Sequence, residues 1–124
     1  MKIYNSLISD YSDIKKEEFN IYCCGPTVYN YIHIGNARPS ILMDVVVRYL
    51  KTKNIKVNFL QNITDVDDKI IQKAIDENKS EKEISEFYSQ AFINDLKNLN
   101  ILMPTKLIPI SQEMEGMIQF INDL

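Results

Sequence analysis

A group of polar and small residues at positions 23–38 is the part of the chain best equipped for chemistry. It follows an apolar, β-prone segment and precedes a helix predicted over residues 38–52. Open α/β sheets bind nucleotides at such junctions, beyond the carboxyl end of a strand, and a helix N-terminus offers free N–H groups to phosphate. Gly35 permits close backbone approach, and His33 and Asn36 can each donate a hydrogen bond to phosphate. The segment predicts an ATP phosphate site, although a histidine beside a glycine is by itself usually structural.

Two adjacent cysteines, Cys23 and Cys24, open this group. A disulfide between neighbours strains the backbone, so the pair does not predict a disulfide framework. Reduced thiols in a cytosolic enzyme are small buried hydrophobes or metal or catalytic ligands. Composition alone favours the buried role.

The segments around this group predict an α/β fold. Residues 1–9 are expected to form a short strand or hairpin arm, and residues 19–24 and 57–63 to form buried strands. Alternation of strand and helix is the β-α-β pattern of a parallel sheet with a right-handed crossover. Only two parallel strands are identified, and the last predicted helix stops at Leu124 without a Gly, Asn or cationic C-cap. Residues 1–124 are therefore expected to be part of a larger domain.

Four helices are predicted, each with apolar residues at helical spacing. The first covers residues 38–52, with Pro39 in its first turn. The second has Thr64 as N-cap and Asp65, Asp67 and Asp68 in its first turn. The third opens with the capping box of Ser80 and Glu83, and the fourth is capped by Ser111. Their apolar faces are, in chain order, Ile41, Leu42, Val45, Val46, Tyr49 and Leu50; Val66, Ile70, Ile71 and Ala74; Ile84, Phe87, Tyr88, Ala91, Phe92, Leu96 and Leu99; and Met114, Met117, Ile118 and Ile121. Asp44 and Arg48 are expected to pair across one turn of the first helix.

Composition narrows the function classes. The net charge is −3, from 14 basic and 17 acidic residues, which argues against this segment as the main grip on nucleic acid. The one local basic cluster, Lys51, Lys53 and Lys56, fits a solvated helix end. No apolar run reaches the roughly 18 residues of a membrane span, and the first residues lack the apolar run of a signal peptide. A cytoplasmic protein is expected.

Beyond these features, the motifs resemble the class I aminoacyl-tRNA synthetases in their cysteinyl form. The stretch from Cys24 to Arg38, CGPTVYNYIHIGNAR, is similar to the HIGH region of that family. A second block, NITDVDDK at residues 62–69, also matches. So do residues 2–7, 44–50 and 99–104, and the blocks follow the family order over essentially all 124 residues.

The resemblance implies a Rossmann-type parallel-sheet catalytic domain, of which residues 1–124 would be the N-terminal portion. It implies activation of L-cysteine by ATP with magnesium to cysteinyl-adenylate, followed by transfer to tRNA-Cys. His33 and Asn36 are the implied catalytic residues. The implied ATP and adenylate contacts are Gly25, Pro26, Thr27, His33, Gly35, Asn36, Asn62, Ile63 and Thr64.

The resemblance also implies that Cys24 is one ligand of a zinc ion that holds the substrate cysteine as a thiolate. Zinc selects sulfur over the serine hydroxyl without an editing site. Strand alternation directs Cys23 to the opposite face, where it would pack. The remaining family ligands, a Cys, a His and a Glu, would lie beyond Leu124.

Some positions depart from the family pattern or suit a structural role. Asn36 replaces the second His of HIGH; its amide donates but cannot be protonated, and asparagine also suits a helix N-cap. Pro39 stands where relatives often carry a hydroxyl. The acids at 65–68 fit the first turn of a helix better than a metal site. Lys69 is interpreted as a surface or salt-bridging residue.

Two alternatives remain open. One is a ligase that joins cysteine to an amino sugar, as in mycothiol biosynthesis, with the same Cys24, HIGH region and Thr64 block. The other is a non-catalytic nucleotide-binding or interaction module. The family's KMSKS-type loop and anticodon-binding helices do not occur in the sequence, so the isolated chain is predicted to be catalytically incomplete. A monomer without membrane contact is expected.

Overall fold

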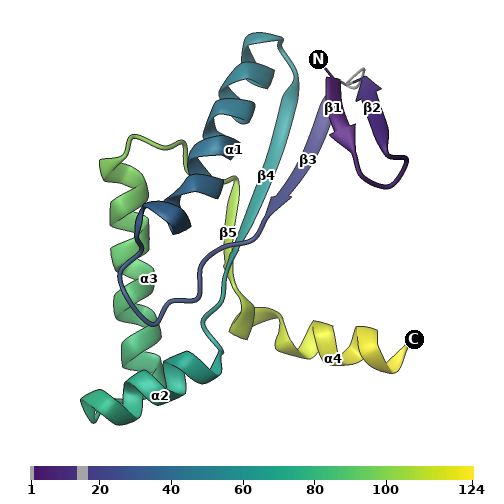
Figure 1. Ribbon diagram of the computed structural model, residues 1–124. Coiled ribbons are helices and arrows are strands. Elements are labelled where there is room, and N and C mark those ends of the chain that lie inside the picture. Colours follow the sequence, from purple (N-terminus) through teal and green to yellow (C-terminus); the bar gives the residue numbers. More distant parts are fainter. Residues whose placement is uncertain (1, 14–16) are drawn as a thin grey trace.

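The computed structural model describes residues 2–13 and 17–124, and Met1, at the start of the first predicted strand, lies outside the described residues. In chain order the elements are β1 (Lys2–Asn5), β2 (Asp10–Asp13), β3 (Glu18–Cys23), α1 (Ile34–Thr52), β4 (Lys56–Ile63), α2 (Asp68–Glu77), α3 (Glu81–Asn98), β5 (Lys106–Pro109), the 3-10 helix η1 (Ile110–Glu113) and α4 (Met114–Asn122). In the view of Figure 1, α1 and α3 lie to the left of the sheet, and the β1–β2 hairpin and α4 project to the right.

The central element is a parallel sheet in the order β3-β4-β5, beside an antiparallel β1–β2 hairpin. The predicted α/β class with parallel strands is confirmed. The sequence identified β3 and β4 to within one residue but missed β5. Pro104 and Pro109 flank or end this segment and are typical of an interruption, but proline is tolerated in an edge strand where it removes no ladder hydrogen bond.

The first helix begins earlier than predicted. It starts at Ile34 rather than near Arg38, so Pro39 lies inside α1 and not in its first turn. The residues that α1 buries are Ala37, Ser40, Val47 and Leu50. Much of the predicted apolar face is exposed: Ile41, Leu42, Val45 and Tyr49 are 37% to 59% accessible. Because α1 is apolar on several sides, spacing alone did not select the side that meets the sheet.

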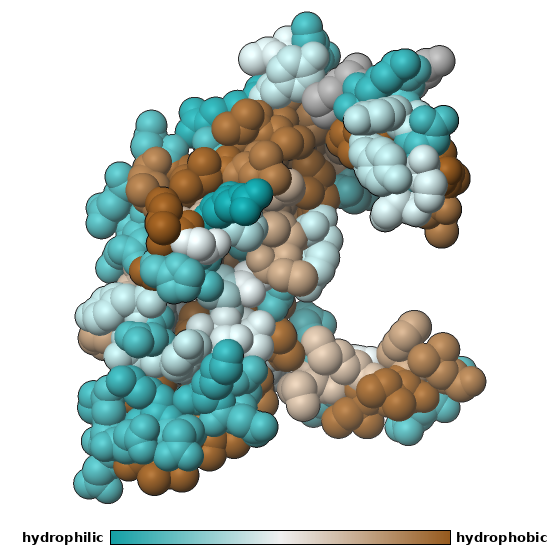
Figure 2. Space-filling view, in the orientation of Figure 1, coloured by the Kyte–Doolittle hydropathy of each residue, from teal (hydrophilic) through white to brown (hydrophobic). Residues whose placement is uncertain are grey.

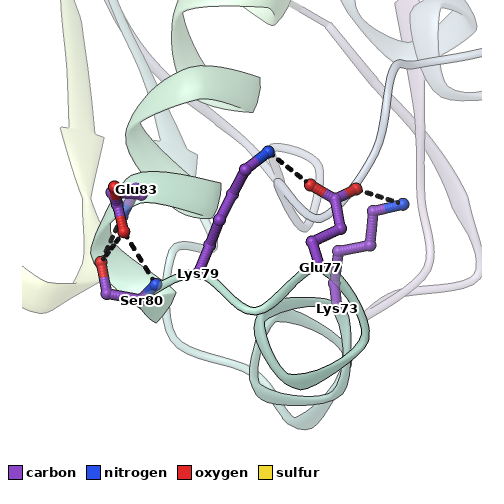
Figure 3. Close-up of polar contacts among 5 residues, drawn as sticks. All are labelled: Lys73, Glu77, Lys79, Ser80 and Glu83. Atoms are coloured by element: carbon purple, nitrogen blue, oxygen red, sulfur yellow. Dashed lines mark hydrogen bonds and ion pairs between the residues drawn. The ribbon is translucent and has the colours of Figure 1, made fainter.

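The main hydrophobic core lies where α2 and α3 meet the end of β4. It contains Val28, Ile63, Ile70, Ala74, Ile84, Tyr88, Phe92, Leu96 and Ile101. The predicted capping box of α3 is confirmed, with Ser80 and Glu83 exchanging hydrogen bonds (Figure 3). In the same corner the Glu77 carboxylate lies between the ammonium groups of Lys73 and Lys79, and the hydrogen bonds from Lys79 and then Lys73 lower the pKa of Glu77.

The last helix differs from its prediction. Its N-cap is Glu113, without a side-chain hydrogen bond, and Ser111 instead contacts Asp65. The apolar residues Met117, Ile118 and Ile121 are exposed, and Figure 2 shows apolar surface along α4 and near α1. Within the described residues, no helix is long and apolar enough to cross a membrane.

The predicted pair of Asp44 and Arg48 does more than link two turns of α1. Arg48 Nε lies 2.8 Å from Asp44 Oδ2, and Arg48 Nη2 donates to the carbonyl of Asn100 at 2.7 Å. Asp44 Oδ1 accepts from the Leu102 backbone N–H at 2.8 Å. Burial alone would raise the pKa of Asp44, but the hydrogen bonds from Arg48 and Leu102 outweigh it and lower that pKa. The pair therefore attaches α1 to the segment between α3 and β5.

We expect Asp44→Ala to lower the free energy of unfolding at pH 7 by about 2 kcal/mol, since it removes charge-assisted hydrogen bonds. A carboxylate whose pKa is lowered by folding stabilises the fold above its unfolded pKa, about 3.9, and loses this effect as pH falls through the folded value. The difference between the two proteins in urea unfolding should therefore shrink below about pH 4. Glu86→Ala is the matched control, because its partner Lys82 is 3.8 Å away and both side chains are highly exposed. Equal losses from both changes would contradict the assignment.

Candidate nucleotide site

The loop that follows β3 is joined directly to the end of β4. Thr64 donates its backbone N–H to the Pro26 carbonyl at 3.0 Å, and Val28 donates to the Thr64 carbonyl at 3.1 Å. Thr27 and Thr64 form a parallel bridge that extends the β3–β4 pairing. The two motif blocks, whose bridged residues Thr27 and Thr64 are 37 positions apart in the chain, thus form one continuous edge beyond the carboxyl ends of the strands. The predicted N-cap role of Thr64 is wrong, because its backbone is paired and α2 begins only after Asp67.

Asn62 holds this edge together through its side-chain amide. Its Oδ1 accepts from the Gly25 N–H at 3.0 Å and from the Tyr22 hydroxyl at 2.9 Å. Its Nδ2 donates to the Thr64 hydroxyl at 3.1 Å. Sequence analysis did not single out Tyr22, although strand alternation places it on the same side of β3 as Cys24.

Gly25 is required by space rather than by backbone angle. A Cβ at this position would lie 1.6 Å from the Asn62 carbonyl oxygen, so another residue would push the loop away from β4. Gln61, which is 2% exposed, fixes the same turn from its buried side. Its Nε2 donates to the Cys24 carbonyl at 3.3 Å and to the Ser40 hydroxyl at 3.1 Å, linking β4, the turn and α1.

His33 and Asn36 form the start of α1. His33 is the N-cap, and its Nδ1 accepts from the Gly35 N–H at 3.0 Å. Asn36 Oδ1 in turn accepts from the His33 N–H at 3.2 Å. Because Nδ1 is an acceptor, neutral His33 carries its proton on Nε2, and Asn36 keeps its NH₂ group free to donate. A Cβ on Gly35 would lie 2.7 Å from the His33 ring, so the glycine makes room for the imidazole.

A depression of about 210 Å³ opens beside this helix start. It is lined by Pro26, Thr27, Tyr29, Asn30, Tyr31, Ile32, His33, Asn36 and Lys69. The structure therefore brings four of the residues expected to contact ATP, namely Pro26, Thr27, His33 and Asn36, into one cavity. Asn62 and Thr64 lie in the supporting hydrogen-bond network instead, and Ile63 is 2% exposed and packs in the core. Tyr29, Tyr31 and Lys69 are lining residues that the sequence did not identify.

The two cysteines lie in different environments. Cys24 is exposed, whereas Cys23 is partly covered, and burial followed by the charge of Cys24 raises the pKa of the Cys23 thiol. Among the described residues, 2–13 and 17–124 taken together, no three His, Cys, Asp or Glu side chains gather closely enough to hold a metal ion. Cys24 has the accessibility of a metal ligand, but these residues do not complete a site.

The acidic run has structural partners, as its sequence favoured. Asp67 is the N-cap of α2, with its Oδ1 accepting from the Lys69 N–H at 2.9 Å, and Asp68 lies in the first turn. Asp65 is outside that turn, contrary to prediction, and accepts from the backbone and hydroxyl of Ser111. Asp65 thereby joins the end of β4 to η1.

Comparison with known proteins places the chain among synthetases. The family model described as the class I (C) tRNA synthetase catalytic domain matches residues 10–124. Over 124 residues the chain is 59% identical to the cysteine–tRNA ligase of Mycoplasma capricolum and 60% identical to that of Mesoplasma florum. It is 48% identical to the cysteine–tRNA ligase of Lachnoclostridium phytofermentans over 127 residues. All of this chain is covered in each comparison, but it spans only 27% to 28% of the length of these relatives.

We expect Gly25→Ala to destabilise the protein by about 3 kcal/mol, because the added methyl group would overlap the Asn62 carbonyl. Thermal unfolding followed by circular dichroism measures the effect. Gly116→Ala is the control, since a Cβ there meets only Glu113 Oε2 at 4.0 Å and alanine in an exposed helix is favoured over glycine by about 1 kcal/mol. Equal melting temperatures for the two variants would show that the contact between the turn and β4 is not required.

Proposed function

Because the chain belongs to the class I (C) tRNA synthetase catalytic domain family, we propose that it carries the nucleotide-binding part of a cysteine–tRNA ligase. In that reaction the cysteine carboxylate attacks the α-phosphate of ATP, with magnesium, to give cysteinyl-adenylate and pyrophosphate. The terminal hydroxyl of tRNA-Cys then takes the cysteinyl group. The observation that carries the proposal is the joining of the HIGH-like loop to the Thr64 block at one strand edge, with a cavity beside it.

His33 and Asn36 are proposed to act on the phosphates of ATP. Their mutual hydrogen bonds fix which atoms remain available, namely His33 Nε2–H and the Asn36 NH₂ group. Both are neutral donors held by the first turn of a 19-residue helix. Donors fixed before the reaction stabilise developing phosphate charge without reorganising. Asn36 can therefore serve as the capping partner and as a phosphate donor at once, which also explains how asparagine can stand in for the second His of HIGH.

Pro26 and Thr27 are proposed to contact the nucleotide from the wall of the cavity, whereas Gly25, Asn62 and Thr64 are proposed to shape the adenylate pocket. Gly25 and Asn62 act by holding the turn, since their atoms meet each other. Gly35 acts by admitting the His33 ring. Ile63 is proposed to contribute only through its backbone, because its side chain lies in the core.

Cys24 is proposed to be one ligand of a zinc ion that would bind the thiol of the substrate cysteine. Its exposure fits this role, and zinc at this position would deprotonate a thiol and prefer it to a hydroxyl. The other ligands must come from outside the described residues, since none of these completes the site. The same proposal makes residues 1–124 the N-terminal portion of the catalytic domain, in a monomeric cytoplasmic protein.

A chimera tests the function directly. In it, this chain replaces the matching 124 residues of the Mycoplasma capricolum ligase, to which it is 59% identical. The chimera should catalyse cysteine-dependent ATP–pyrophosphate exchange and charge tRNA-Cys, whereas the 124-residue chain alone should do neither. Transfer of cysteine to an amino sugar but not to tRNA would favour the amino-sugar ligase. Failure of a folded, zinc-loaded chimera in both reactions would favour a non-catalytic module.

For His33, we expect His33→Asn in the chimera to lower pyrophosphate exchange by 100- to 1,000-fold, which is typical of losing one transition-state donor. Asparagine can still cap α1, so the melting temperature should change little. Comparable losses of stability and activity would show instead that His33 acts only as a cap.

For the metal, Cys24→Ser in the chimera should abolish zinc retention and discrimination between cysteine and serine, because a hydroxyl is a poor zinc ligand where a thiolate is needed. Cys23→Ser is the neighbouring control and should retain zinc. Metal content is measured by atomic absorption after dialysis against a weak chelator. One zinc per Cys24→Ser protein would refute this assignment.

A further inference from the structure

Lys69, interpreted from the sequence as a surface or salt-bridging residue, lines the same cavity as the start of α1. It is the second residue of α2 and lines the same depression as His33 and Asn36. Its ammonium group lies 5.4 Å from the centroid of the Tyr29 ring. In the part of the chain that the structure describes, no carboxylate lies within ion-pairing distance of Lys69. The residue is exposed, so of the two roles interpreted from the sequence the surface position is confirmed and the salt bridge is not found.

Two of the three nearby aspartates, Asp65 and Asp67, have hydrogen-bond partners of their own. Asp67 is turned to the backbone N–H of Lys69, and Asp65 to Ser111. Lys73 and Lys79 both pair with Glu77 (Figure 3), and Lys82 pairs with Glu86. Lys69 thus differs from the other lysines of α2 and the start of α3, because its charge is not neutralised by an acid of the described chain.

A lysine held by an aromatic ring differs from a lysine paired with a carboxylate. The face of Tyr29 attracts the ammonium group and limits its freedom, but it does not cancel the positive charge. In the same cavity, His33 Nε2 and the Asn36 amide are available as hydrogen-bond donors, and the first turn of α1 contains no acid. A polyphosphate bound in this cavity would therefore meet hydrogen-bond donors from α1 and one cation, Lys69.

We propose that Lys69 is an anion-binding residue of this cavity, which grips the polyphosphate of a nucleotide whose other side is held by His33 and Asn36. Lysine binds phosphate as a point charge on a flexible stem, so it can follow the phosphate chain as ATP becomes adenylate and pyrophosphate. This inference deepens the proposed function and rests on it, because it assumes that the cavity binds a nucleotide.

The test compares three variants of the chimera described above by calorimetric titration with ATP, inorganic tripolyphosphate and adenosine. Lys69→Met should weaken binding of ATP and tripolyphosphate by roughly 10- to 100-fold, as expected for a lost charge-assisted contact, and leave adenosine binding unchanged. Lys69→Arg should retain most of the affinity. Lys73→Met removes the same charge one helical turn further along α2, where Lys73 pairs with Glu77. This variant should bind all three probes like the unaltered chimera.

The outcomes separate this inference from the proposed function. If the unaltered chimera binds neither ATP nor tripolyphosphate, the nucleotide site and the role of Lys69 are both overturned. If it binds both but Lys69→Met behaves like Lys73→Met, only the role of Lys69 is overturned. Equal loss of adenosine and tripolyphosphate binding in Lys69→Met, with an unchanged circular dichroism spectrum, would also overturn it, because a charge contact should not affect adenosine.

Discussion

The backbone pairing of Pro26 and Val28 with Thr64 is the contact on which the rest of the site depends. It carries the β3–β4 ladder past the ends of the two strands and fixes the path of a loop that would otherwise be free. Asn62 reinforces it with three side-chain hydrogen bonds, and Gln61 ties the same turn to α1. Loop residues so constrained can hold a ligand without first losing much conformational entropy.

Hydrogen bonds within the protein also determine which donor atoms the cavity presents. His33 and Asn36 satisfy each other at the start of α1, and this leaves one defined donor on each. Two of the acids in residues 65–68 have structural partners: Asp67 caps α2 and Asp65 accepts from Ser111. A chain with net charge −3 thus still presents hydrogen-bond donors from His33 and Asn36 in one cavity.

The sequence determined what depends on neighbours along the chain. The strands near residues 19–24 and 57–63, the Ser80–Glu83 capping box and the Asp44–Arg48 pair all follow from local pattern and short spacing, and all are present. The motif order also sufficed to identify the family. The grouping of His33 and Asn36 in one cavity followed from their separation by three residues at a helix start.

Tertiary structure decided what depends on distant segments. Thr64 has the side chain of an N-cap, but pairing with residues 26–28 occupies its backbone and moves the start of α2 to Asp68. The buried side of α1 and the strand β5 were settled by the sheet, because an apolar helix has several possible faces and a four-residue strand has little signal of its own. Tyr22 and Lys69 gained their partners, Asn62 and Tyr29, across 40 residues of chain. Only the folded backbone brings such residues together, since no local spacing encodes a contact of that length.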